Sequence, residues 1–138
     1  MIHHTAVSYK LNSDQFEANN RYHQQQFNFK SSLGFYLGYH YEINKAGLSR
    51  QARADGEAAA ACYQQNHNNG ETIHIALDGN FDIEKPNPPQ IYSLRDLLKY
   101  LAKRYNIKRE NILFHRQYAK KSCPGKNMDL NFIRNLAG

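Results

Sequence analysis

Residues 72–80 read Thr-Ile-His-Ile-Ala-Leu-Asp-Gly-Asn, and no other stretch says as much about the fold. The first six are the most β-like run in the chain, because β-branched and apolar side chains dominate them. The Asp-Gly-Asn that follows favours a turn, so we expect the strand to end there. Working outward, we expect further strands at the first residues up to the paired histidines, at 37–43, at 48–51 after a turn at 44–47, and at 112–114.

Helical periodicity occurs between these strands. The proline cluster at 86–89 opens the clearest helix, whose repeating face would carry Ile91, Leu94, Leu98, Leu101 and Tyr105. Another helix is expected from Ser13 to about Phe29, with one face formed by Phe16, Asn20, His23 and Phe27, and a last one over 129–136. Strands alternating with helices, together with one hairpin, predict an α/β class. We therefore expect a single domain over residues 1–138, a central mixed β-sheet flanked by helices.

Composition limits the possible classes of protein. Apolar residues make up 41% of the 138 residues, enough for a core, and the longest apolar runs, such as 58–63, are too short to span a membrane. The net charge of +6 favours an anionic partner: nucleic acid, an acidic membrane surface or a bacterial wall. The stretch 52–70 is ambiguous, because alanines favour a helix while the Asn and Gln that follow favour a loop, which we expect in its second half.

Three residues could bind a metal. His115 ends an expected strand and is followed by a loop that reaches Cys123. An imidazole and a thiolate are good zinc ligands, and His3 from the first strand would leave a fourth position open for water. Spacing alone leaves other interpretations open: hydrogen-bonded histidines, a buried thiol, or a mononuclear copper site with Met128, although such sites usually place a histidine between the cysteine and the methionine.

Four segments occur together in one order: 2–6 (Ile-His-His-Thr-Ala), 37–41 (Leu-Gly-Tyr-His-Tyr), 72–81, and 115–125 from His-Arg to Ser-Cys-Pro-Gly. In this order they resemble the zinc-dependent N-acetylmuramoyl-L-alanine amidases, the family that includes phage lysozyme-like amidases and peptidoglycan recognition proteins. The resemblance covers nearly the whole chain and implies the peptidoglycan recognition protein-like amidase fold. It also implies that His3, His115 and Cys123 hold one Zn²⁺ per chain, while strand alternation turns His4 to the opposite face.

The resemblance assigns roles to further residues. Tyr39 matches the tyrosine beside the zinc-bound water of phage-type members, and Lys121 matches their catalytic lysine, a cation able to stabilise an oxyanion. A glutamate that some relatives place nearby is absent, which leaves the general base open. Arg50 is expected either to face the peptide stem of the substrate or to lie in solvent. Cys62, where many members have a histidine, is expected to be a free thiol, and His74, where a glycine is common, is interpreted as a strand side chain.

The resemblance implies a hydrolase: a zinc amidase that cleaves the amide bond between N-acetylmuramic acid and L-alanine in peptidoglycan, as a bacteriolytic, endolysin-like protein. The alternative is a non-catalytic peptidoglycan-binding domain, but such members typically lose a zinc ligand. A nucleic-acid binder is a third hypothesis, disfavoured because Lys and Arg are scattered. We expect a monomer with bacterial peptidoglycan as partner. No secretory signal is visible, so we expect the protein in the cytoplasm before its release to the wall, or secreted if an export signal was trimmed.

Overall fold

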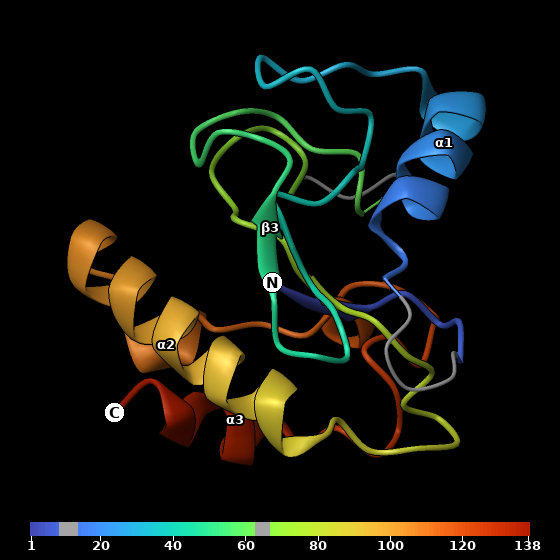
Figure 1. Cartoon of the computed structure of the whole chain (residues 1–138). Helices are drawn as coiled ribbons and strands as arrows, with labels where there is room; N and C mark the ends of the chain where they lie inside the picture. Colours follow the sequence, from blue (N-terminus) through green and yellow to red (C-terminus); the bar gives the residue numbers. More distant parts are fainter. Residues whose placement is uncertain (9–13, 63–66) are drawn as a thin grey trace.

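Four short strands form one mixed sheet in the computed structural model, which describes residues 1–8, 14–62 and 67–138 (Figure 1). The order across the sheet is β1 (Ile2–His4), β4 (Ile75–Leu77), β2 (Tyr41–Ile43) and β3 (Ser49–Gln51). β4 pairs in parallel with both β1 and β2, and β2 and β3 form an antiparallel hairpin. The predicted α/β class and mixed sheet are confirmed. β4 is an inner strand, since it pairs with both β1 and β2.

The strands are shorter than the sequence predicts. Pairing of the 72–80 stretch begins only at Ile75, and the predicted strand at 112–114 makes a single parallel bridge, from Phe114 to Ile2. The predicted strand at 37–43 begins only at Tyr41, because the carbonyl of His74 accepts hydrogen bonds from two successive amides, those of His40 (2.9 Å) and Tyr41 (3.1 Å). A strand needs regular alternation along its ladder, and this doubled contact interrupts it.

The interruption at His40 also changes which way Tyr39 faces. A regular strand over the predicted range 37–43 would place Tyr39, Tyr41 and Ile43 on one face, and the structure contradicts this. Tyr41 and Ile43 belong to the main core, whereas Tyr39 packs against a smaller cluster that contains Phe16 and Leu37. Because residues 37–40 are irregular, the two-residue period of a strand no longer applies to them.

α2 (Pro88–Tyr105) and α3 (Leu130–Leu136) lie together on one side of the sheet (Figure 1). Asn87 and Gln90 form a reciprocal capping box at the start of α2, as the proline-rich sequence there suggests. The residues of α2 buried against the sheet are Gln90, Leu94, Leu98 and Leu101. Tyr105, predicted for the same face, is instead 43% exposed and donates its hydroxyl to Asp55. Along the described residues, no helix combines the length and the apolar character needed to cross a bilayer.

α1 (Phe16–Phe27) packs near the other face of the sheet and holds the loop that leads to Tyr39. Its predicted face makes these contacts: Phe16 is buried, Asn20 accepts hydrogen bonds from the amides of Tyr36 and Leu37, and His23 accepts one from Gly38 at 2.7 Å. Phe27, at the end of that face, is 41% exposed. The predicted cap at Ser13 lies outside the described residues.

The stretch 52–70 is irregular wherever it is described, including the alanine-rich half. Arg53 explains how such a segment is held. Its buried guanidinium donates to two backbone carbonyls outside this stretch, those of Leu37 (2.7 Å) and Phe29, and to one within it, that of Ala58 (3.4 Å). These bonds satisfy carbonyls that regular secondary structure would otherwise pair.

Two carboxyl groups are buried between the sheet and α1. Glu42 accepts a hydrogen bond from Asn19 at 2.7 Å, and Asp78 accepts one from the backbone amide of Gln15 at 3.1 Å. The second oxygens, Glu42 Oε2 and Asp78 Oδ1, have no partner among the described residues. Burial, and for Glu42 also the neighbouring Asp78 charge, raises the pKa of both carboxyl groups. A proton retained by the pair therefore explains how these two oxygens can be buried without a hydrogen-bond donor, because the pair then carries less negative charge.

We predict that Glu42→Gln removes a contribution that weakens the fold as the pH rises. The raised pKa of Glu42 means that the folded protein keeps a proton that the unfolded chain releases above about pH 4.5, so this carboxyl group should cost stability as the pH rises from about 5 to about 8. The buried histidines, whose pKa values are lowered, act in the opposite direction in both proteins, so the difference between the two profiles reports on Glu42. The amide of glutamine supplies a permanent hydrogen in place of that proton. Denaturant unfolding across this range should show the variant losing on the order of 1–3 kcal/mol less than the wild type.

Glu17→Gln, a change at an exposed position of α1, is the matched control and should follow the wild-type profile. Parallel pH profiles for the wild type and Glu42→Gln would contradict a retained proton at Glu42 and Asp78.

Candidate metal centre

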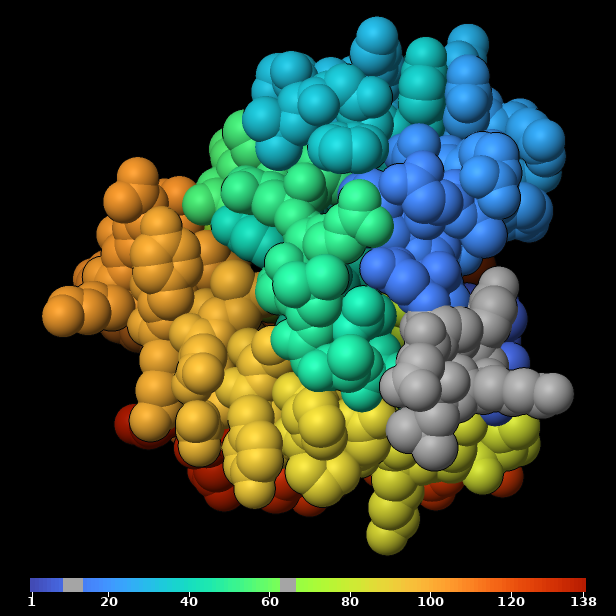
Figure 2. All heavy atoms as spheres, viewed as in Figure 1, coloured from blue at the N-terminus to red at the C-terminus, as the bar shows by residue number. Residues whose placement is uncertain are grey.

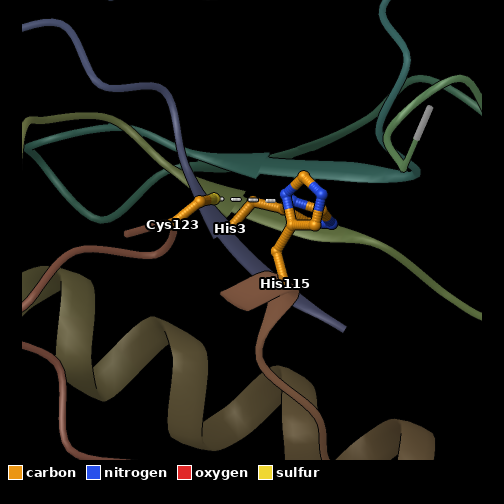
Figure 3. A group of neighbouring side chains, drawn as sticks. All are labelled: His3, His115 and Cys123. Atoms are coloured by element: carbon orange, nitrogen blue, oxygen red, sulfur yellow. Dashed lines mark hydrogen bonds between the residues drawn. The ribbon is translucent and has the colours of Figure 1, made fainter. Parts of the chain in front are cut away.

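The three predicted metal ligands lie together, although they are far apart in the sequence (Figure 3). His3 comes from β1, His115 opens the 3-10 turn η2 (His115–Gln117), and Cys123 lies in the loop that follows. One donor atom of each lies within 4.8 Å of the other two. The bridge from Phe114 to Ile2 brings His115 to the edge of β1, so the sheet itself sets the separation of the two imidazoles.

The donor atoms suit zinc in kind and in spacing. The distance from His3 Nδ1 to Cys123 Sγ is 3.7 Å. A tetrahedral zinc with bonds of about 2.05 Å to nitrogen and about 2.3 Å to sulfur would separate these ligands by about 3.6 Å. Two nitrogens and one sulfur are a common zinc donor set, and they leave a fourth position for a non-protein ligand.

The protonation states of the three side chains are compatible with binding a metal ion. Burial lowers the pKa of His3, and burial with the nearby Lys121 charge lowers that of His115 to about 4, so both rings are neutral and can donate a lone pair. Burial raises the pKa of the Cys123 thiol to about 11. A buried thiol with this pKa becomes a thiolate when a metal ion compensates its charge.

The loop that carries Cys123 is fastened to its own start. The amide of Arg116 donates to the carbonyl of Cys123 at 2.8 Å, and its guanidinium donates to the carbonyls of Gly125 and Met128, each at 2.7 Å. Gly125 has a φ of +109°, and a Cβ atom there would lie 2.5 Å from the backbone of Phe81. Only glycine suits this position, which explains the Gly that follows Cys-Pro in the sequence.

Tyr39 and Lys121 both lie near the three ligands. The ring centroids of Tyr39 and His3 are 5.1 Å apart, and burial raises the pKa of the phenol well above its ordinary value, so the hydroxyl keeps its proton near neutral pH. Lys121 is exposed on the Cys123 loop. Its charge adds to the lowering of the His115 pKa and partly offsets the rise that burial causes in the Cys123 pKa. Tyr39 and Lys121, the two predicted catalytic residues, therefore lie near the three predicted ligands.

A pocket of about 380 Å³ opens beside Tyr39. Its walls are Thr5, Val7, Asn19, Tyr22, His23 and Tyr39. A larger cavity, of about 760 Å³, lies between α2 and the segment 69–73, and none of the predicted ligands lines it. None of the three ligands lines the smaller pocket either, but its wall residue Tyr39 contacts the His3 ring, so this pocket adjoins the candidate metal centre.

Arg50 lies apart from the three ligands. It is on β3, in the hairpin that reaches the surface between α1 and α2 (Figure 2). Its guanidinium lies 4.0 Å from the centre of the Phe16 ring and pairs with Asp14 and Glu17, each at 3.5 Å. A role in substrate binding stays a prediction for this residue.

Sequence reasoning missed one neighbour of the ligands, His74. Its Nδ1 lies 2.8 Å from Nε2 of His3, so the residue interpreted as a plain strand side chain touches the metal centre. The sequence does contain a signal for this contact: His74 is a polar ring between two isoleucines, in a run that is otherwise suited to burial. Cys62, in contrast, matches expectation: it is a buried free thiol.

Comparison with known proteins places this geometry in a family. Residues 1–126 match the family model described as N-acetylmuramoyl-L-alanine amidase. Among solved structures, the N-acetylmuramoyl-L-alanine amidase LysC from Clostridium intestinale URNW is similar with a TM-score of 0.77 and 27% identity, over 97% of this chain and 80% of that one. Drosophila peptidoglycan recognition protein SD has the same fold, with a TM-score of 0.77 at 23% identity over 92% of this chain and 73% of that one.

A curated relative gives a weaker but consistent match. Peptidoglycan-recognition protein SD of Drosophila simulans is 29% identical over 91 residues, which are 65% of this chain and 47% of the relative. The chain thus spans about half the length of the curated relative that it matches. The family match covers most of the chain and includes all three predicted ligands. This chain therefore belongs to the N-acetylmuramoyl-L-alanine amidase family.

Proposed function

We propose that this protein is a zinc-dependent amidase that hydrolyses the bond between N-acetylmuramic acid and L-alanine in peptidoglycan. The observation that carries the proposal is the convergence of His3, His115 and Cys123 in a chain of the amidase family. Two neutral imidazoles and one thiol that can ionise would hold a single Zn²⁺ and leave one coordination position free.

The chemistry of amide hydrolysis fits the residues around this centre. Zinc, when bound, supplies a Lewis acid that makes water a nucleophile near neutral pH and polarises a carbonyl. The Lys121 ammonium would stabilise negative charge on the carbonyl oxygen of the substrate. The Tyr39 hydroxyl, which keeps its proton, would donate a hydrogen bond at the reacting centre. The pocket beside Tyr39 would hold part of the substrate.

Membership of the amidase family supports peptidoglycan as the partner. The net charge of +6 would help the protein adsorb to a wall that carries anionic polymers. We propose that the protein acts as a monomer in the manner of a phage lysin, present in the cytoplasm until release, or secreted if an export signal was trimmed.

A non-catalytic peptidoglycan-binding domain is the second candidate. The similarity to peptidoglycan recognition protein SD favours it, because both proteins share the fold. Retention of Cys123, together with Tyr39 and Lys121 beside it, favours the enzyme. Bound zinc without turnover of peptidoglycan would favour the binding domain.

We predict that Cys123→Ala abolishes both zinc binding and peptidoglycan hydrolysis, since it removes the only sulfur ligand. The measurements are metal content per chain and release of new L-alanine amino ends from purified peptidoglycan. Cys62→Ala removes the other buried thiol and is the matched control, which should keep about one zinc per chain and its activity. Full zinc content in Cys123→Ala would contradict the proposed ligand set.

A second prediction concerns catalysis without a change in the metal. Lys121→Ala should retain zinc but lower kcat by about 10²–10³-fold, the usual loss when one group that stabilises an oxyanion is removed. Lys120→Ala, at the adjacent exposed lysine, carries the same loss of charge and should stay within a few-fold of the wild type. Equal losses in the two variants would indicate that Lys121 contributes only general charge.

A further inference from the structure

A chain of hydrogen bonds runs from the candidate metal centre into the protein interior through His74. Its Nδ1 lies 2.8 Å from His3 Nε2, and its Nε2 lies 2.7 Å from the carbonyl oxygen of His67. The His74 side chain is fully buried. Each ring nitrogen therefore has one defined partner.

The direction of these bonds follows from the carbonyl at one end. A carbonyl oxygen can only accept a hydrogen bond, so Nε2 of His74 must carry the hydrogen. No carboxylate bonds to this ring among the described residues, and a buried imidazole without such a partner is neutral. A neutral imidazole has one N–H, so Nδ1 of His74 holds a lone pair.

The same reasoning fixes the next ring. Since Nδ1 of His74 accepts, Nε2 of His3 must donate, and the His3 lone pair is then on Nδ1. Nδ1 is the atom that lies 3.7 Å from Cys123 Sγ. The arrangement therefore turns the electron pair of His3 toward the other two ligands.

His74 is itself held in place. Its backbone amide donates to Nδ1 of His40 at 3.0 Å, and Nε2 of His40 lies 2.9 Å from the carbonyl oxygen of Glu57. The rings of His40 and His74 are stacked, with centroids 5.8 Å apart and planes 8° from parallel. The His74 ring thus has little freedom to turn away from His3.

We propose that His74 is a positioning residue that selects the Nε2–H tautomer of His3 and so prepares Nδ1 to bind a metal. The inference rests on the proposed metal site and adds to it a residue that contacts one of the ligands. Groups that orient a metal-binding histidine in this way typically change metal affinity by about 10–100-fold when removed.

The test compares two variants of nearly equal shape. His74→Asn keeps a hydrogen-bond acceptor close to the position of Nδ1, whereas His74→Leu has the same branching and no acceptor. Zinc dissociation constants, measured by competition with a chelator, should stay within about 3-fold of the wild type for His74→Asn and rise by about 10–100-fold for His74→Leu. Equal affinities for the wild type and His74→Leu would overturn the proposal.

A second measurement needs no variant and no zinc. Long-range ¹H–¹⁵N NMR of the wild-type protein without metal reports which nitrogen of His3 carries the hydrogen, and we expect Nε2. A hydrogen on Nδ1 would overturn the proposal even if His74→Leu failed to fold. If zinc binds and responds as expected but peptidoglycan is not cleaved, the proposed activity fails while the role of His74 stands.

Discussion

The parallel pairing of β1 with β4 is the constraint on which the rest of the site depends. Its register places His3 opposite Ala76, and a slip by one residue would exchange the faces of His3 and His4. Ile2 of β1 also forms a parallel bridge with Phe114, and this bridge fixes where the turn at His115 begins. A pairing of three residues thus orients one proposed ligand and delivers the second.

The two faces of the sheet differ in how they are stabilised. The face under α2 is a continuous apolar core, whereas the region near α1 and the metal centre contains buried histidines and carboxyl groups. Side chains bonded to backbone hold the loops there: Arg53 ties the segments around Leu37 and Ala58, and Arg116 closes the loop of Cys123. Loops fixed in this way can carry reactive groups at defined positions without regular secondary structure.

Family membership and the local chemistry agree at the three proposed ligands. The donor set suits zinc, and the separation of His3 Nδ1 from Cys123 Sγ is close to the value for two ligands of a tetrahedral zinc. The ring of His74 lies within hydrogen-bonding distance of His3, one of the proposed ligands. The buried pair of Glu42 and Asp78 lies near Tyr39 and contributes to its raised pKa. The proposed ligands are thus surrounded by buried polar groups.

The sequence by itself determined the α/β class, the helix at Pro88–Tyr105 and the hairpin, because periodicity and turn residues are local signals. Through ordered motifs it also indicated His3, His115 and Cys123. Only the tertiary structure decided the short strands, the side on which Tyr39 packs, the pairing of Glu42 with Asp78, and the contact of His74 with His3. Each of these depends on groups that lie tens of residues apart or on a break in alternation, and no local pattern encodes which buried polar groups will meet.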